Sequence, residues 1–263
     1  MAGLAVEHKK HISAVILAAG SGRRIGGDIR KQYIELKGRP LICRTVDVFE
    51  KYSEIDDIIL VVPADDKEYV KKEIVQRYGF TKVRAVVDGG SERYFSVAKG
   101  LEYIRKGLSD KADTSAELVM IHDGARPFVN EAVLGRICEA FESSLTRKDV
   151  FAAVVSVKAK DTLKYADDDG YVLKSLDRDH IYVMQTPQAF SLSVIDEAYK
   201  KLLSEMNRSD ESINITDDAM VLERYFPQYK IRLIEGSYDN FKITTAEDIS
   251  YAEFVLNTAK KSC

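Results

Sequence analysis

The sequence predicts an α/β fold in which a mixed, mostly parallel sheet is covered by helices on both faces. Three observations predict this class. The first half of the 263-residue chain alternates short apolar runs with amphipathic segments. Glycine, proline or aspartate bounds each run, as is typical of buried strands. The right-handed crossovers that join parallel strands place helices on both faces of the sheet.

Four strands and four helices are expected in this first half. The strand-like runs cover residues 13–19, 57–63, 83–89 and 117–124. The helical segments cover approximately residues 40–51, 65–78, 91–106 and 130–145. Three of the strand-like runs end in polar, glycine-bearing stretches, AAGSG, VDGGSER and HDGARP. Because ligands bind beyond the carboxyl ends of strands in such sheets, we expect these stretches to lie together at one edge.

The second half of the chain predicts a β-arm and then more helices. Residues 161–176 read DTLKYADDDGYVLKSL, which indicates a hairpin and predicts a protruding arm at about 157–178. Thr245, followed three residues later by Asp248, predicts a helix N-cap. No linker or repeat interrupts the chain, so residues 1–263 are expected to form one domain. The remaining elements are expected as helices over 191–206, 216–226 and 245–261 and a strand over 230–236.

Composition excludes several classes of protein. Lysine and arginine number 39 and aspartate and glutamate 42, for a net charge of −3, which argues against a general nucleic-acid or membrane binder. Cys43, Cys138 and Cys263 are far apart, which argues against a zinc or redox site and fits a reducing cytoplasm. We see no signal peptide and no stretch of 18 apolar residues, so we expect a cytoplasmic protein.

Residues 17–36, LAAGSGRRIGGDIRKQYIEL, form a glycine-rich loop that fits neither common phosphate-binding pattern. A Walker loop needs lysine where Asp28 stands, and the dinucleotide fingerprint needs glycine where Ile25 stands. One interpretation is a solvated basic turn. The other is a triphosphate cradle whose side chains neutralise charge that develops during reaction. The cations between Gly20 and Pro40 are Arg23, Arg24, Arg30, Lys31, Lys37 and Arg39.

A second candidate site is the stretch DGGSERYFSV, residues 88–97. Gly89 and Gly90 follow a strand and are expected to leave room for a ligand. Arg93 and Ser96 are three residues apart, so they share one face of the following helix. The alternative is a plain connection between strand and helix.

A third candidate site is HDGARPF, residues 122–128. Asp123 stands at a strand end, where its carboxylate could hold Mg²⁺ together with phosphate oxygens. The alternative for Asp123 is an Asx turn before Gly124. Arg126 is expected to pair with a nearby acid, and His122 is expected to be packed or hydrogen-bonded rather than a metal ligand.

Three later stretches carry weaker signals. KDTLK (160–164) and DRDHIYVMQTPQAF (177–190) offer lone threonine and arginine side chains. In NITDDAMVLE (214–223), Thr216 and Asp217 resemble a helix cap. A lysine, Lys242, lies in an apolar, strand-like stretch in which Phe241 and Ile243 are expected to point the other way. It could close over an anionic ligand or be a solvated strand residue.

Taken in order, these motifs resemble the 2-C-methyl-D-erythritol 4-phosphate cytidylyltransferase family of the non-mevalonate isoprenoid pathway. The resemblance runs from about Ala14 to Phe254. Each motif is weak alone, but the seven in order are highly specific. They are LAAGSGRR…KQYIEL, DGGSER..SV..GL, HDGARPFV, KDTLK, DR……QTPQAF, TDDA..LE and NFKITTAEDI.

The resemblance implies a Rossmann-like nucleotidyltransferase fold and a homodimer joined by exchanged β-arms. It implies transfer of CMP from CTP to the polyol phosphate with Mg²⁺, releasing pyrophosphate. The residues implied to wrap CTP are Ala18, Ala19, Gly20 and Gly22. Those implied to stabilise the transition state at the α-phosphate are Arg24 and Lys31. Those implied to select cytidine are Gly90, Arg93 and Ser96, and Asp123 is implied to lie beside Mg²⁺ and the triphosphate.

The resemblance also implies a set of residues that hold the polyol phosphate. They are Thr162, Arg178, Thr186, Thr216 and Lys242. Arg178 and Lys242 are implied to position it for attack, and Thr162, on the arm, to serve the neighbouring subunit. The attacking phosphate oxygen is already ionised at neutral pH, so no general base is needed. The sequence departs from the family pattern at three positions: Ile25 replaces a common Met, Arg30 a frequent Pro and Tyr182 a frequent Trp.

Three other functions remain open on the sequence alone. Ribitol-5-phosphate cytidylyltransferases share the fold and most of the motifs, although HDGARPF and the Asp-Arg pair at 177–178 look more like the methylerythritol enzyme. A sugar-1-phosphate nucleotidyltransferase would use UTP or GTP instead. A nucleotide-binding regulator would bind CTP without releasing pyrophosphate.

Overall fold

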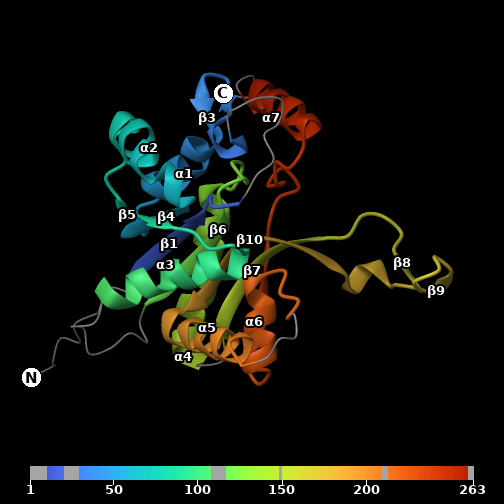
Figure 1. The fold of residues 1–263 in the computed structure, drawn as a ribbon. Coiled ribbons are helices and arrows are strands. Elements are labelled where there is room, and N and C mark those ends of the chain that lie inside the picture. The colour runs from blue at the N-terminus through green and yellow to red at the C-terminus, as the bar shows by residue number, and fades with distance from the viewer. Residues whose placement is uncertain (1–10, 21–29, 108–116, 148–149, 209–212, 260–263) are drawn as a thin grey trace, which may run out of the picture.

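The computed structural model describes residues 11–20, 30–107, 117–147, 150–208 and 213–259. Within them a seven-stranded sheet has the order β11-β7-β10-β6-β1-β4-β5 (Figure 1). Only β10 is antiparallel to its neighbours, so the expected mixed, mostly parallel sheet is confirmed. The strands are β1 (Ile12–Leu17), β4 (Asp57–Val62), β5 (Val83–Asp88), β6 (Leu118–Asp123), β7 (Val150–Lys158), β10 (Tyr182–Ser191) and β11 (Lys230–Glu235).

Helices cover both faces of this sheet, as expected (Figure 1). The longer ones are α1 (Leu41–Lys51), α3 (Arg93–Gly107), α4 (Glu131–Arg147), α5 (Leu192–Met206), α6 (Asp218–Tyr225) and α7 (Ala246–Ala259). Shorter segments are the 3-10 turns η1 (Lys31–Tyr33), η2 (Ala64–Asp66) and η4 (Arg178–His180), and the helix α2 (Lys67–Tyr69), which continues as the π-helical segment η3 (Val70–Gln76). A two-stranded ribbon joins β2 (Glu35–Leu36) and β3 (Arg39–Pro40).

The alternation of side chains along β1 divides the interior into two cores. Ala14 and Ile16 pack with α1, α4 and η3 on one face. Val15 packs on the other face with α3, α5 and α6. A strand that is buried on both faces is apolar at nearly every position, which explains the apolar run that predicted it. Within the described ranges, no helix has the length and apolar character needed to cross a membrane.

β1 is the topological switch point of the sheet. The chain proceeds from β1 to β4 and β5 on one side, and then returns to place β6 on the other side of β1. The loops after these strands remain joined beyond the sheet: Ala18 N donates to Val61 O at 2.7 Å and Gly124 N to Leu17 O at 2.8 Å. Because crevices form at switch points, this edge is the expected place for a ligand.

Two central strands, β7 and β10, were not predicted from the sequence. The sequence of β10, YVMQTPQAFS, lacks an apolar run because the buried side chains of Gln185, Thr186 and Gln188 are polar. A register shift also separates Met184 from Gln188 in its pairing with β7. The hydrogen bonds of the buried glutamines and threonine replace the apolar contacts that usually reveal a strand.

One predicted strand was wrong: the stretch around Lys242 belongs to no sheet. Ile243 N donates to Ala125 O at 2.9 Å, and no ladder follows among the described residues. The expected alternation nevertheless holds, because Ile243 is buried and Lys242 is exposed. The predicted cap of the next helix is confirmed, since Asp248 N donates to Thr245 Oγ1 and Thr245 N to Asp248 Oδ2.

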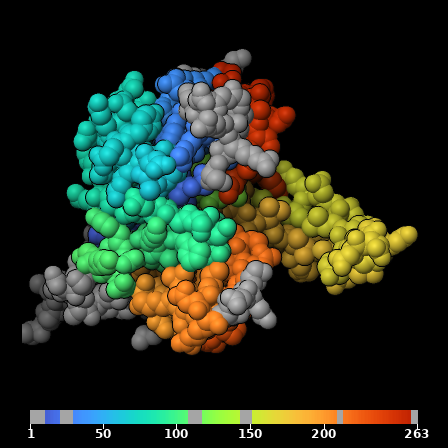
Figure 2. Space-filling view, in the orientation of Figure 1, coloured from blue at the N-terminus to red at the C-terminus, as the bar shows by residue number. Residues whose placement is uncertain are grey.

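The predicted hairpin is present between β7 and β10. Strands β8 (Lys164–Ala166) and β9 (Val172–Ser175) pair antiparallel. Gly170 has a φ of 85°, and Tyr171 N donates to Asp167 Oδ1 at 2.8 Å, which closes the turn. The arm projects away from the body of the molecule (Figures 1 and 2). Its surface carries the exposed apolar side chains of Tyr165, Tyr171, Val172 and Leu173.

Gly89 is required for a close approach of two loops at the switch-point edge. A Cβ atom there would lie 2.2 Å from the Cβ of Ala19 and 3.4 Å from Val62 O. We therefore expect Gly89→Ala to lower the free energy of unfolding by about 1–3 kcal/mol, as overpacking does. The double variant with Ala19→Gly should recover much of this loss, because it removes the clashing atom. Urea unfolding checks both.

Gly135→Ala is the matched control for this prediction. A Cβ atom at Gly135, within α4, would meet only Tyr52 Oη at 3.6 Å. Since glycine is unfavourable within a helix, this variant should be more stable by about 0.5–1 kcal/mol. Equal effects of both substitutions would contradict the steric explanation.

Candidate active site

A cavity of about 490 Å³ opens at the carboxyl ends of β1, β5 and β6. It brings together the loops after these strands, the 3-10 turn η1 and the segment before α7. Most of the residues predicted to bind nucleotide therefore share one site, as does Lys242. Those that line the cavity are Ala18, Ala19, Gly20, Lys31, Gly90, Arg93, Ser96, Asp123 and Lys242.

The other predicted residues that the structure describes do not line this cavity. Gly22 and Arg24 are outside the described residues. Thr162 and Arg178 are exposed at the base of the arm, where Arg178 Nη1 donates to Lys160 O at 3.0 Å. Thr186 is buried behind Asp123, and Thr216 is exposed just before α6. A single chain therefore does not gather the predicted polyol set around this cavity.

The start of the glycine-rich loop after β1 is fixed by the buried side-chain amide of Gln32. Gln32, in η1, is 5% exposed and donates from Nε2 to Ala18 O at 3.0 Å. This role of Gln32, which directly follows Lys31, was not predicted from the sequence. The bond ties the start of the loop to the turn that carries Lys31, so both are positioned together.

The loop after β5 is closed by Ser96 rather than left open. Gly90 N donates to Ser96 Oγ at 3.0 Å, and Ser96 Oγ contacts Glu92 O at 3.3 Å. A Cβ atom on Gly90 would lie 2.2 Å from the Cβ of Phe95. The expectation that Gly89 and Gly90 simply leave room for a ligand was therefore incomplete, because packing against protein atoms already requires both glycines.

Asp123 is a carboxylate surrounded by cations. Lys242 Nζ lies 2.9 Å from Oδ2, Arg93 Nε 3.4 Å from Oδ1 and Arg126 Nε 3.7 Å from Oδ2. Burial would raise the pKa of Asp123, but Arg93, Lys242 and Arg126 outweigh it and hold that pKa well below its ordinary value. Asp123 is therefore ionised at neutral pH. The expected ion pair of Arg126 with a nearby acid is confirmed.

Lys31 faces the same cavity from η1. Burial lowers its pKa from the ordinary value, and the nearby charge of Lys242 lowers it further. An anion placed between the ammonium groups of Lys31 and Lys242 would stabilise both positive charges. The cavity is thus electrostatically prepared for a phosphate-rich ligand.

Two other described cations of the loop region, Arg30 and Arg39, are paired with acids. Arg30 Nε lies 3.4 Å from Asp66 Oδ2, although Arg30 also lines the cavity. Arg39 makes a two-pronged contact with Asp47 at 2.6 Å. These pairs fit the view that Lys31, rather than every cation of the segment, is aimed at the ligand.

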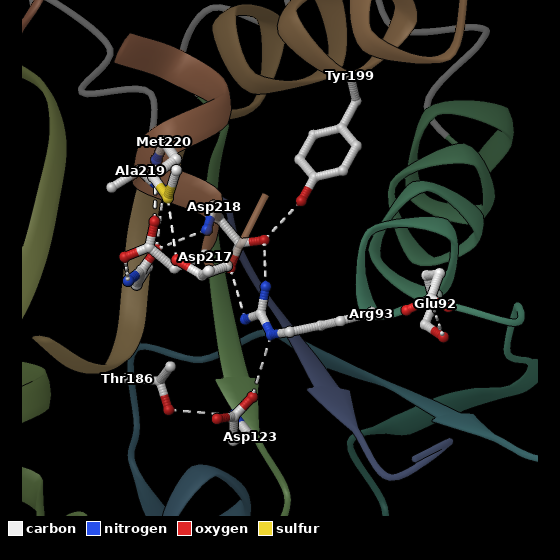
Figure 3. A network of polar contacts seen from close by, with 12 residues as sticks. Glu92, Arg93, Asp123, Thr186, Tyr199, Asp217, Asp218, Ala219 and Met220 are labelled. Atoms are coloured by element: carbon white, nitrogen blue, oxygen red, sulfur yellow. Dashed lines mark hydrogen bonds and ion pairs between the residues drawn. The ribbon is translucent and has the colours of Figure 1, made fainter. Parts of the chain in front are cut away.

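A buried ion pair on the opposite wall was not predicted. Arg93 Nη1 and Nη2 each lie 2.7 Å from one oxygen of Asp218, which is 0% exposed (Figure 3). Tyr199 Oη donates to Asp218 Oδ1 at 2.6 Å. Asp218 is the second acid of the TDDA motif. Of the two acids in that motif, only Asp217 was predicted to have a role, as part of a helix cap. That cap is confirmed, since Asp217 accepts from Met220 N.

His122 is a hydrogen-bonded core histidine, as expected. Its Nε2 lies 3.1 Å from Arg126 O, which assigns the proton to Nε2. Thr186 Oγ1 lies 3.0 Å from Nδ1 and also accepts from Asp123 N at 3.1 Å. Burial lowers the pKa of His122 to about 4. The neutral ring thus supports the threonine that holds the backbone of Asp123.

The residues present fit a magnesium ion only as part of a nucleotide complex. Within the described ranges, no three His, Cys, Asp or Glu side chains are grouped to hold a metal. Asp123 offers a buried carboxylate to the cavity. One carboxylate together with substrate phosphates is the usual protein contribution to Mg²⁺ binding.

The fold and this cleft define the Rossmann-like nucleotidyltransferase class, and comparison with known proteins places the chain within it. The family model of 2-C-methyl-D-erythritol 4-phosphate cytidylyltransferase matches residues 12–258. A relative with that name from Alkaliphilus oremlandii is 39% identical over 97% of this chain and 99% of its own length. Another from Lachnoclostridium phytofermentans is 40% identical over 93% of this chain and 96% of its own.

Solved structures agree with this. The crystal structure of 4-diphosphocytidyl-2C-methyl-D-erythritol synthase from Anaerococcus prevotii superposes with a TM-score of 0.76 at 35% identity, covering 95% of this chain and 99% of that one. The corresponding enzyme of Francisella tularensis has a TM-score of 0.71 at 29% identity, covering 93% and 99%. The chain belongs to the 2-C-methyl-D-erythritol 4-phosphate cytidylyltransferase family.

Protonation of His122 should lower stability in acid. Its pKa of about 4 in the folded protein is below the ordinary 6.5, so the unfolded chain binds the proton more readily. The stability contributed by the neutral ring is present above pH 6.5 and is lost as the pH falls towards 4. It amounts to about 3 kcal/mol, at 1.36 kcal/mol per pH unit.

His122→Gln removes this titration. Urea unfolding between pH 7 and pH 4.5 should show a shallower decline for the variant than for the wild-type chain. Other acidic groups affect both proteins equally, so the difference isolates His122. Parallel declines would contradict the assignment.

Proposed function

We propose that this chain transfers CMP from CTP to 2-C-methyl-D-erythritol 4-phosphate, giving 4-diphosphocytidyl-2-C-methyl-D-erythritol and pyrophosphate. The observation that carries the proposal is the convergence of Lys31, Lys242 and Asp123 on one cavity at the switch point of the sheet. Membership of the family supports the choice of both substrates. The reaction would contribute to non-mevalonate isoprenoid biosynthesis.

The geometry suits an attack by one anion on another. The polyol phosphate oxygen is ionised at neutral pH and needs no base, so the main barriers are charge repulsion and orientation. Lys31 and Lys242 face the cavity and would stabilise the negative charge that builds on the α-phosphate and the leaving pyrophosphate. The proposed role of Arg24 belongs to the same step, but Arg24 lies outside the described residues.

Mg²⁺ is the proposed cofactor, with Asp123 as its protein contact. When bound, it would neutralise triphosphate charge as a Lewis acid. Lys242 is held by Asp123 at 2.9 Å while its side chain stays 41% exposed. Its remaining N–H bonds are therefore available to an incoming phosphate.

The polyol phosphate site is proposed to form between two copies of the chain. Thr162 and Arg178 lie on the arm, while Lys242 lies at the cavity of the body. The arm also exposes 73% of Tyr171 and 61% of Val172, apolar surface that a partner subunit would bury. We therefore propose a homodimer with exchanged arms, in which Thr162 serves the neighbouring site.

The proposed compartment is the cytoplasm. Cys43 and Cys138 are both buried thiols, as is expected in a reducing environment.

A substrate panel tests the proposed reaction. Pyrophosphate release is measured with CTP, UTP or GTP, each with methylerythritol phosphate or ribitol 5-phosphate, in the presence of Mg²⁺. We expect turnover with CTP and methylerythritol phosphate. Turnover with ribitol phosphate or with another nucleotide would support the corresponding rival enzyme instead. CTP binding without pyrophosphate release from any pair would indicate a regulator.

Lys31→Ala should lower kcat by about 10²–10³ while CTP still binds, because one preorganised cation is lost at the developing charge. Steady-state kinetics and calorimetric titration with CTP check the two halves of this expectation. Lys37→Asn is the control, because Lys37 is an exposed cation of the same segment. Asparagine also tolerates its φ of 51°. Near-normal turnover of Lys31→Ala would remove Lys31 from the mechanism.

Mixed dimers test whether the arm serves the neighbouring site. Thr162→Glu places a repelling carboxylate at the polyol phosphate, and Lys31→Ala disables the body of a site. If arms are exchanged, a purified dimer of the two variants has one intact site and about half of the wild-type turnover. A dimer of Lys31→Ala with Asp123→Asn is the control and should stay inactive. Inactivity of the first dimer would place Thr162 in its own chain's site.

A further inference from the structure

Asp218 contacts Arg93 in the interior of the protein, beside the nucleotide cavity. Its carboxylate is fully buried at the start of α6. It accepts a hydrogen bond from each terminal nitrogen of the guanidinium, at 2.7 Å in both cases (Figure 3). Two parallel bonds fix the plane of the guanidinium as well as its distance. Only Nε then donates to Asp123, in a long hydrogen bond of 3.4 Å to Oδ1. Arg93 is therefore held at this longer distance from Asp123.

The position of Asp218 does not depend on Arg93 alone. The backbone N of Asp218 and that of Ala219 donate to Gln188 Oε1 at 3.0 and 2.9 Å. Gln188 Nε2 donates to Asp217 Oδ2 at 2.9 Å. The first turn of α6 is thus fastened to β10, and Tyr199 on α5 supplies a further donor. The carboxylate is a fixed anchor for the two terminal nitrogens of Arg93, whose side chain still lines the cavity.

We propose that Asp218 is a positioning residue for the nucleotide cleft, which keeps Arg93 from closing on Asp123 and leaves the Asp123 carboxylate available to the divalent cation bound to CTP. Without a charge at position 218, the guanidinium would shorten its contact with Asp123, the other acid with which it is paired. Lys242 also touches Asp123, but its side chain is 41% exposed and can turn to solvent or to phosphate. The Arg93 side chain is less exposed, at 26%, and is therefore less free to turn away from Asp123.

This inference rests on the proposed function, because it takes metal-bound CTP as the ligand. Its test therefore measures binding and not turnover. Calorimetry gives the Kd of CTP in EDTA and the Kd of the preformed Mn²⁺–CTP complex. The Kd of free CTP divided by the Kd of Mn²⁺–CTP reports how much the ion strengthens binding. Direct effects of Arg93 on CTP itself cancel from this ratio. In Asp218→Asn this ratio should fall about tenfold, the scale of effects from groups that orient metal ligands.

Two further variants separate positioning from fold stability. Tyr199→Phe removes a buried donor to the same carboxylate but no charge, so it should lower the melting temperature and leave the ratio unchanged. Arg93→Gln with Asp218→Asn removes both charges, so no guanidinium can close on Asp123. The double variant should regain the wild-type ratio that the single variant loses.

An unchanged ratio in Asp218→Asn would overturn the proposal and leave Asp218 a purely structural residue. A ratio lost equally in the double variant would also overturn it. If Asp218→Asn does not fold, the double variant can still overturn the proposal, because it leaves no unpaired buried charge and a ratio below the wild-type value there contradicts the proposed role. A wild-type chain that binds both forms of CTP equally overturns this inference alone. One that binds neither form contradicts the proposed function.

Discussion

The ionised carboxylate of Asp123 is the interaction around which the cleft is organised. Burial opposes its charge, so it requires the cations Arg93, Lys242 and Arg126, each of which comes from a different segment of the chain. Those segments meet because β6 ends beside β1 at the switch point of the sheet. The fold therefore sets the distances between the charges, and the charges hold the loops that the strands leave unpaired. The same few contacts therefore fix the loops and place the charged groups of the cavity.

Neutral polar side chains position the charged residues Asp123 and Asp218 through hydrogen bonds to their backbone N–H groups. Thr186 accepts from the backbone of Asp123 and faces the buried His122, while Gln188 fastens the turn that carries Asp218. Both Thr186 and Gln188 belong to β10, which buries these polar side chains beside the apolar Ala189 and Phe190. In a core the polar groups would be costly without partners, but here Thr186 bonds to Asp123 and Gln188 to the turn that carries Asp218. β10 thus serves as a polar support for the cleft.

Sequence reasoning predicted most of the fold because the strands of the first half are buried on both faces and read as apolar runs. It failed for β10, where Gln185 and Gln188 replace that pattern, and around Lys242, where an extended segment alternates like a strand but pairs with none. The nucleotide residues could be predicted because each lies in a short local motif. The pairing of Arg93 with Asp218 could not, since 125 positions separate them and a single sequence records no contacts.

The antiparallel direction of β10 has a consequence for how the enzyme can be assembled. Because β7 runs with β6 and β10 runs against both, the connection between β7 and β10 leaves the sheet at the edge where the cavity opens. That connection is the arm. Had β10 been parallel, a crossover would have returned the chain to the far edge, and any surface built there would be remote from the chemistry. One reversed strand thus places the arm, with the apolar side chains that it exposes, at the edge of the sheet where the cavity opens.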